Sequence, residues 1–316
     1  MKSIKICTYF GLICLFSIIT VWTGCSEPNK KQADFYFNRP ALAWNESIPI
    51  GNGTLGGMVY GGIESDTIKI NEETLWSGGP RDLQNYEAIK HLPKIRRLLL
   101  DDKTKEAEAL IDSVMLGEWN ECYMPMGDLI IEQTGASEPI DYTRRLELDK
   151  GLVTIDYSTD ETEFNKTVFA SFPDKAIVVK LSANKPGKIN VSTSLTSLLQ
   201  HQVKVEGDQV VLSGNAPKHA YPHYLGKKDP VYENGFGMRF QMRLLVRNKG
   251  GVATVESEKI VVSDADEVEL ILTAATSFNG FDKDPVAEGK DYETFCKDQI
   301  ANIEKLSFKN IKTRHI

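Results

Sequence analysis

The stretch that decides the fold is IGNGTLGGMVYGGIESDTIKINEETLWSGGP, residues 50–80. Six glycines fall within twelve positions at its start, and an alternating segment, DTIKINEETLW, follows. Ile68 and Ile70 occupy one face of that segment and Lys69 and Asn71 the other, as in a half-buried β-strand. Glycines before such a strand allow sharp turns and close approach of the backbone. The pattern therefore predicts a glycine-shaped edge of a β-sandwich.

Two catalytic interpretations of this stretch are disfavoured by its spacing. A phosphate-binding loop needs a helix directly after the glycines, whereas Met58 and Val59 continue a strand, and no Gly-Lys-Ser/Thr follows. Glu72 and Glu73 form a tempting carboxylate pair, but neighbours on one strand point to opposite faces. Glycosidases need both carboxyl groups in one cleft. We therefore expect a structural role for either glutamate.

Alternating segments dominate the rest of the chain and are typical of an all-β protein. Short strands with turn signals run from about residue 127 to 276, without a βαβ rhythm, which predicts a large antiparallel β-super-sandwich over 38–278. Apolar residues at helical spacing predict a short helical insertion at about 86–116. The same spacing predicts the start of a helical linker over 279–316.

The N-terminal residues indicate export. Lys2 and Lys5 precede an apolar stretch that ends at Thr-Gly-Cys25, which resembles the lipobox of bacterial lipoproteins. We therefore expect a signal peptide at 1–25, lipid on Cys25, and a polar tether over 26–37. Because Ser26 rather than aspartate follows the lipidated cysteine, we expect anchoring at the outer membrane or in the periplasm of a Gram-negative bacterium. An uncleaved transmembrane anchor is the alternative.

Composition and residue spacing do not favour nucleic-acid binding or a metal site. The chain has 37 basic and 44 acidic residues and a net charge of −7, which gives no electrostatic footprint for nucleic acid. Cys122 and Cys296 remain after removal of the signal, far apart in sequence, and a disulfide between them stays open. No Cys or His spacing indicates a metal site, since prolines at 217 and 222 break the helix that His219 and His223 would need. We therefore expect no metal and no cofactor.

Residues 44–80, WNESIPIGNGTLGGMVYGGIESDTIKINEETLWSGGP, resemble the N-terminal signature of glycoside hydrolase family 95, the α-L-fucosidases. The resemblance continues in order over about 38–315 through YMPMGDLIIE, GNAPKHAYPHY, GMRF and LILTAATSF. Met124 and Met126 depart from the expected glutamine and leucine, which puts a polar contact in doubt. The resemblance implies a β-super-sandwich followed by a helical linker, an (α/α)₆ barrel that inverts configuration, and a C-terminal β-domain.

The family's catalytic residues lie in the barrel, and no position here matches one, so none is carried over. We therefore expect the N-terminal domain of an α-L-fucosidase, truncated before its barrel and without hydrolysis of its own. The intact enzyme would act on fucosylated glycans. The expected barrel- or sugar-facing residues are Trp44, Asn52, Asn71, Glu72, Trp76 and Tyr224. A surface carbohydrate-binding module that uses Trp44, Trp76, Tyr221 or Tyr224 as a sugar platform is an alternative, as is a fragment of a decayed gene.

Overall fold

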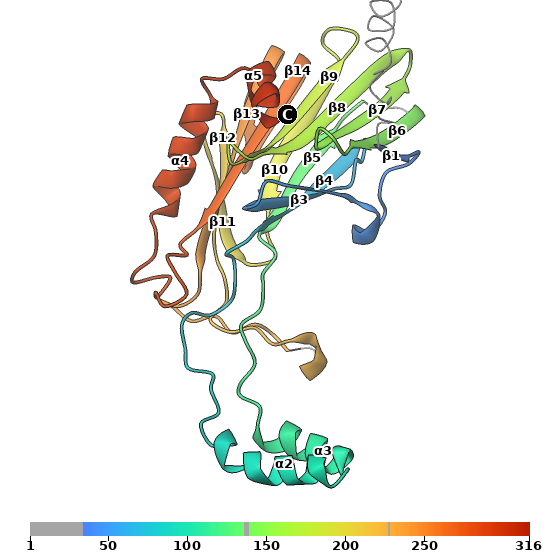
Figure 1. The fold of residues 1–316 in the computed structure, drawn as a ribbon. Helices are drawn as coiled ribbons and strands as arrows, with labels where there is room; N and C mark the ends of the chain where they lie inside the picture. The colour runs from blue at the N-terminus through green and yellow to red at the C-terminus, as the bar shows by residue number, and fades with distance from the viewer. Residues whose placement is uncertain (1–33, 136–138, 227) are drawn as a thin grey trace, which may run out of the picture.

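The computed structural model describes residues 34–316 apart from 136–138 and 227. The predicted signal peptide and Cys25 lie outside the described residues. The protein is built from antiparallel strands with few helices, as expected from the alternation (Figure 1). The first half of the described chain contains β1 (Asp34–Phe37), η1 (Trp44–Glu46), β2 (Ile48–Gly51), β3 (Leu55–Val59), β4 (Ser65–Glu72), η2 (Ala88–Lys90), α2 (Leu92–Leu100), α3 (Thr104–Val114), β5 (Gly127–Gln133), β6 (Ile140–Glu147) and β7 (Leu152–Thr159). The second half contains β8 (Thr162–Ser171), β9 (Ala176–Ala183), β10 (Ile189–Thr196), β11 (Gln200–Glu206), β12 (Gln209–Asn215), η3 (His223–Leu225), β13 (Arg239–Glu256), β14 (Lys259–Thr276), α4 (Tyr292–Ile303) and α5 (Phe308–His315).

One long strand, β14, joins the two layers of the sandwich. On one side it pairs with β13 along its length, and β13 in turn pairs with β12. On its other side, residues 260–265 pair with β10 and residues 267–272 pair with β9. The sheet therefore divides at β14 into a branch β9-β8-β7-β6-β1 and a branch β10-β5-β4-β3-β2. β2 and β3 contact β8, so the two branches face each other as layers.

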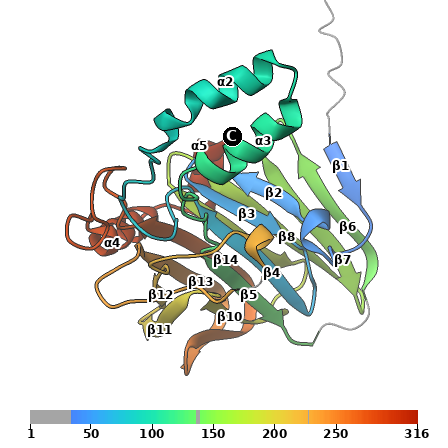
Figure 2. The same cartoon turned by 90° about the horizontal axis from the view of Figure 1, so that it is seen from below.

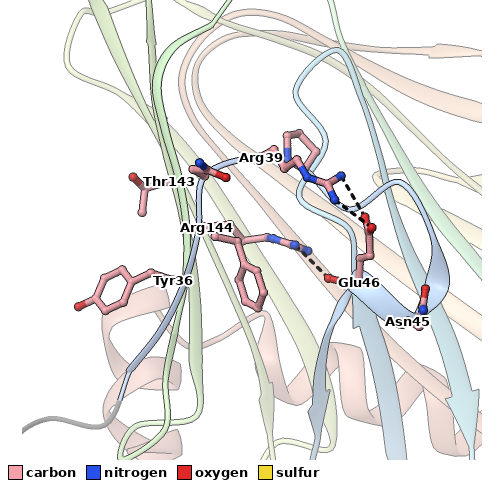
Figure 3. Close-up of a pocket in the computed structure, with 9 residues that line it drawn as sticks. Tyr36, Arg39, Asn45, Glu46, Thr143 and Arg144 are labelled. Atoms are coloured by element: carbon pink, nitrogen blue, oxygen red, sulfur yellow. Dashed lines mark hydrogen bonds and ion pairs between the residues drawn. The ribbon is translucent and has the colours of Figure 1, made fainter.

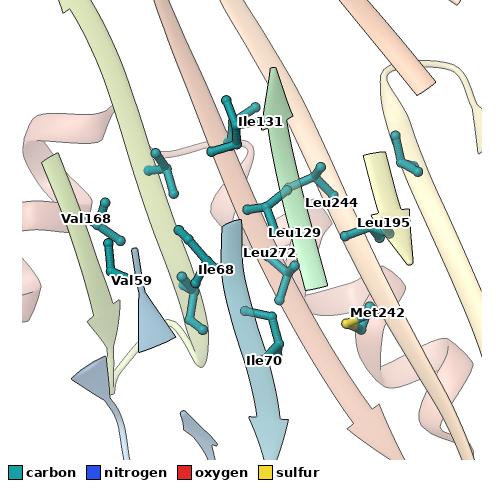
Figure 4. Close-up of a cluster of buried hydrophobic side chains, with 14 of the residues drawn as sticks. Val59, Ile68, Ile70, Leu129, Ile131, Val168, Leu195, Met242, Leu244 and Leu272 are labelled. Carbon is teal, nitrogen blue, oxygen red and sulfur yellow. The ribbon is translucent and has the colours of Figure 1, made fainter. Parts of the chain in front are cut away.

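The main core fills the space between these layers (Figure 4). The glycine-rich stretch folds as predicted, because Ile68 and Ile70 of β4 are fully buried while Lys69 on the opposite face is partly exposed. They lie with Leu129 of β5 in the core, and Val168 of β8 comes from the facing layer. Burial of such side chains contributes roughly 1.5–3 kcal/mol each, so the alternation predicted from the sequence stabilises the fold.

A buried ion pair also links the layers. Lys166 of β8 and Asp66 of β4 are 2% and 0% exposed, and their Nζ and Oδ2 atoms lie 2.6 Å apart. Lys166 Nζ donates to the carbonyl of Gly62 at 3.0 Å, and the Gly62 N–H donates to Asp66 Oδ1 at 2.9 Å. Two charges out of water are tolerated only when they are paired and hydrogen-bonded, as they are here.

The helical elements confirm the sequence prediction and refine it. The insertion forms η2, α2 and α3, which project from one end of the sandwich (Figures 1 and 2). The C-terminal helices α4 and α5 pack on the outer face of the sheet, where Ile300, Ile303 and Ile311 join a second apolar cluster with Phe169. The tether was predicted over 26–37, but residues 34–37 form β1 and pair with β6. No helix in the described part of the chain is both long and apolar enough to span a membrane.

Candidate functional site

Four connecting segments meet at one end of the sandwich, which we call the loop end: residues 73–91, 115–126, 216–238 apart from 227, and 277–291. Strand register explains their meeting, because Ile70 pairs with Gly127, Asn215 with Arg239, and Phe240 with Thr276. The strand ends that precede or follow these segments therefore lie at the same edge of the sheet. Figures 1 and 2 show the segments leaving the sandwich on the side of α2 and α3. Binding residues on proteins are concentrated on such loops, which a rigid scaffold positions.

Glu121 is the centre of a polar network at the loop end. Ser77 Oγ donates to Glu121 Oε2 at 2.6 Å, and the Cys122 N–H donates to the same Ser77 hydroxyl at 3.0 Å. Arg81 bridges Glu121 and Glu118, with N–O distances of 2.9 Å to each. The Glu121 side chain is only 14% exposed. This network fixes the segment 77–81 against the segment 118–122.

Gly78 allows that close contact. Its φ of +72° lies in the left-handed region, and a Cβ built there would lie 2.4 Å from Cδ of Glu121. Its N–H donates to the carbonyl of Pro217 at 2.9 Å, which brings a third segment into the site. A side chain at this position would therefore meet both backbone strain and a steric clash.

Aromatic rings and cations surround the network. The rings of Trp119, His219 and Tyr221 lie within 4.7 to 6.1 Å of one another, measured between centroids. Lys218 Nζ lies 4.2 Å from the ring centre of Phe236. His219 Nδ1 lies 3.6 Å from Glu121 Oε2, beyond ordinary hydrogen-bond distance.

These groups border a pocket of about 340 Å³. Its walls include the Gly78–Gly79 backbone, Arg81, Glu121, Lys218, His219, Phe236 and Asp284. Donors, acceptors and an apolar ring thus converge on one concave surface, the arrangement that a hydroxylated, partly apolar ligand such as a sugar requires.

A second cavity of about 420 Å³ adjoins the loop end between β4, β14 and α4, and it contains Glu72 and Glu73. β4 ends at Glu72, so Glu73 lies in the following turn and not on the opposite face of the strand. The expectation that the two glutamates are neighbours on one strand is therefore wrong. Glu72 is 7% exposed, and Oε2 accepts hydrogen bonds at 2.7 Å from the N–H and the hydroxyl of Thr74. Burial raises its pKa. These hydrogen bonds from Thr74 stabilise the turn that follows β4, which is a structural role for Glu72.

The other predicted site residues are distributed over several elements. Trp76 is 43% exposed at the loop end and contacts Tyr123, with ring centroids 5.4 Å apart. Asn71 lies on the partly exposed face of β4, opposite Gly56. Tyr224 is exposed in η3 of the loop end, whereas Trp44 is exposed in η1 beside β2.

Asn52 is a structural residue. It is 6% exposed, its amide donates to the carbonyl of Ser171 at 3.0 Å, and Oδ1 accepts from Thr54 and Leu55. Its side chain therefore ties the turn between β2 and β3 to the facing strand β8. The carboxamide oxygen and one amide proton are thus used within the protein, and the side chain is nearly buried.

The described cysteines and histidines form no obvious reactive centre. Cys122 and Cys296 are both free, and Cys296 is buried in α4, which raises the pKa of its thiol to about 12. His219 lies in a β-bridge with Val231 and His223 begins η3, so they share no helix. Within the described ranges, no group of three or more His, Cys, Asp or Glu residues is arranged to hold a metal ion.

Sequence reasoning missed Arg81, Glu121, Lys218, Phe236 and Asp284. The segment GEWNECYMP at 117–125 combines acids and aromatics between two predicted elements, which is a weak signal for a binding loop. Nothing in the sequence shows that residues as far apart as Arg81 and Asp284 share this pocket, because that follows from strand register alone.

The fold resembles part of a larger solved structure. A solved structure titled "Putative kojibiose phosphorylase from human microbiome" matches 91% of this chain and 37% of that chain, with a TM-score of 0.51 and 8% identity. At that identity the likeness concerns the fold alone.

A family model identifies the domain more narrowly. Residues 35–280 match the model for the glycosyl hydrolase family 65 N-terminal domain, and the chain belongs to that family.

Curated relatives confirm the resemblance to α-L-fucosidases. The chain is 32% identical over 292 residues to "Alpha-L-fucosidase 2" of Arabidopsis thaliana, covering 89% of this chain and 34% of the relative. It is 27% identical over 287 residues to "Probable alpha-fucosidase A" of Aspergillus niger, covering 85% of this chain and 34% of the relative. The chain thus spans about a third of the length of these relatives.

Proposed function

We propose that this chain is the non-catalytic N-terminal domain of a family 95 α-L-fucosidase that hydrolyses α-linked fucose from glycans with inversion. The observation that carries the proposal is the 32% identity to an α-L-fucosidase over nearly the whole chain, confined to about a third of the relative. The catalytic acid and the groups that activate water then belong to a separate barrel domain, which is the partner of this one.

The loop end is the surface best suited to border that partner's substrate cleft. Its segments extend beyond the sheet, and its pocket presents Arg81, Glu121 and Lys218 beside the ring of Phe236. Charged donors and acceptors form strong hydrogen bonds to sugar hydroxyls, and an aromatic ring contacts the apolar face of a pyranose. Trp76 and Tyr224 are exposed on the same end.

The Glu72–Glu73 cavity provides the sharpest rival. A buried carboxyl with a raised pKa beside a second carboxylate is a pattern that active sites share. If this cavity were catalytic, the purified protein would release fucose from 2′-fucosyllactose, and Glu72→Gln would abolish the release. We expect no fucose above the buffer control. Glu258→Gln, the same change at an exposed glutamate in the turn between β13 and β14, is the matched control for any effect of Glu72→Gln.

A glycan-binding module without an attached catalytic domain is the second candidate, and exposed Trp76 and Tyr224 favour it. Calorimetry with 2′-fucosyllactose distinguishes the two. A module of this kind binds the sugar by itself at sub-millimolar concentration, whereas a domain that only completes another domain's cleft binds it far more weakly.

We further propose that the protein is held on the outer membrane by lipid on Cys25, as the N-terminal sequence suggests. Expressed in a Gram-negative host, the protein should enter the detergent phase in a Triton X-114 partition, and Cys25→Ala should move it to the aqueous phase. Equal partition of both proteins would remove the proposal.

A further inference from the structure

A cavity of about 680 Å³ lies away from the loop end, at the edge formed by β1, β6 and the segment around η1 (Figure 3). We call it the edge pocket, and its walls include Tyr36, Phe37, Arg39, Asn45, Glu46 and Arg144. None of these residues belongs to the four segments of the loop end. The edge pocket is therefore a separate feature of the protein surface.

The floor of the edge pocket is rigid because Arg144 connects three elements. This β6 residue is 1% exposed, and its guanidinium donates to the carbonyls of Val59, Tyr60 and Glu46 at 3.0 to 3.2 Å. Its Nε–H has no hydrogen-bond partner in the described part of the chain. Arg144 thus holds η1 against β3 and β6.

The rim carries a preformed polar pair. Arg39 forms a two-pronged ion pair with Glu46, with N–O distances of 3.1 and 2.9 Å, and the Leu42 N–H donates to the same carboxylate at 2.9 Å (Figure 3). The Leu42 N–H and the Arg39 guanidinium lower the pKa of Glu46. Planar pairs of this kind offer fixed donors and acceptors to adjacent hydroxyl groups.

An aromatic ring is fixed beside this pair. Phe37 is the direct register partner of Arg144, and the guanidinium carbon lies 4.7 Å from its ring centre. The ring is nevertheless 39% exposed, and Tyr36 and Trp44 nearby in sequence are 62% and 60% exposed. An exposed ring held by a cross-strand contact loses little entropy on binding.

The charges around the pocket favour a neutral ligand. Arg39 is neutralised by Glu46, and the charge of Arg144 is buried and directed at carbonyls. An anionic phosphate or lipid headgroup would find no free cation among the described lining residues. A neutral sugar needs hydroxyl partners and one apolar platform, and the edge pocket supplies both.

We propose that the edge pocket is a second glycan-binding site, which holds a neutral pyranose between the ring of Phe37 and the Arg39–Glu46 pair. It is separate from the loop end and does not depend on the fucosidase activity. Its role would be to keep a glycan chain close to the protein while another part of the glycan is processed.

The test is a titration of the purified protein with 2′-fucosyllactose and with lactose, followed by NMR chemical shifts or calorimetry. Phe37→Ala should weaken binding roughly 2- to 13-fold, the range expected for loss of one aromatic contact. Arg39→Gln should weaken it as well, and because Arg39 is exposed this variant keeps the fold if Phe37→Ala does not. Phe172→Ala, which removes an exposed ring in the turn between β8 and β9, is the matched control and should bind like the parent.

Three outcomes overturn the proposal. One is the absence of binding of either sugar at tens of millimolar. The second is binding that Lys218→Ala weakens while Phe37→Ala and Arg39→Gln do not, which would assign the sugar to the loop end. The third is co-sedimentation with phosphatidylcholine vesicles that depends on Phe37, without sugar binding, which would identify the aromatic edge as a membrane contact.

Discussion

The buried pair of Lys166 and Asp66 gives the most quantitative prediction. Lys166→Met keeps the length and apolar stem of the side chain but leaves Asp66, which is 0% exposed, without its cation. Removing one partner of a buried ion pair costs about 3–5 kcal/mol, because the remaining charge has lost its compensation. The carbonyl of Gly62 also loses its donor. We therefore expect the free energy of unfolding to fall by that amount, measured by urea denaturation.

A double variant separates the charge effect from packing. Asp66→Asn on the Lys166→Met background removes the orphaned charge while its Oδ1 can still accept from the Gly62 N–H, so it should recover more than half of the loss. Lys69→Met is the matched control, because Lys69 and Asp128 form a pair at 3.1 Å that is 40% and 28% exposed. Such a pair contributes about 0.2–1 kcal/mol. The reasoning fails if Lys166→Met costs no more than Lys69→Met.

Three further predictions address the site, the helices and pH. Gly78→Ala should destabilise the protein by about 1–3 kcal/mol, because it combines left-handed backbone with a clash against Glu121; an unchanged melting temperature would contradict this. Ile300→Ala should cost about 2–5 kcal/mol in the same single unfolding transition, since α4 packs on the sheet; a separate early transition for the helix would show that it is independent. The side chains of Lys204 and Arg243 lower the pKa of Glu206 from 4.5 to about 2. The ionised Glu206 should therefore make the folded protein more stable than the Glu206→Gln variant above pH 4.5, and this difference should disappear as the pH falls toward 2. A difference in denaturation midpoint that stays constant over that range would refute the assignment.

The local elements of this fold could be predicted from sequence because their signals are local. The alternation at 65–72 predicted β4, and the helical spacing at 86–116 predicted α2 and α3. β1 was missed because DFYF has only four residues, and it is a strand only by virtue of pairing with β6 more than 100 residues later. The alternating segment was expected to continue to Trp76, whereas β4 ends at Glu72 and Glu73 lies in the following turn.

The candidate site was less accessible to sequence reasoning. Trp76 was singled out because it follows a conspicuous glycine-rich segment, and it lies at the loop end but not in the wall of the pocket, whereas Glu121, Lys218 and Asp284 have no common motif. They meet because the register of β4, β5, β12, β13 and β14 aligns the ends of those strands. Asn52, a polar residue among glycines, forms hydrogen bonds within its turn and to Ser171 of β8, which sequence reasoning did not predict.

The most direct test of the central claim is the release of fucose from 2′-fucosyllactose by the purified protein, followed by a coupled fucose dehydrogenase assay. Because the catalytic groups are assigned to a separate domain, we predict release no faster than in buffer at any pH from 4 to 8. Turnover that co-purifies with the protein and is lost in Glu72→Gln, but not in Glu258→Gln, would contradict the claim and place an active site in the cavity between β4, β14 and α4.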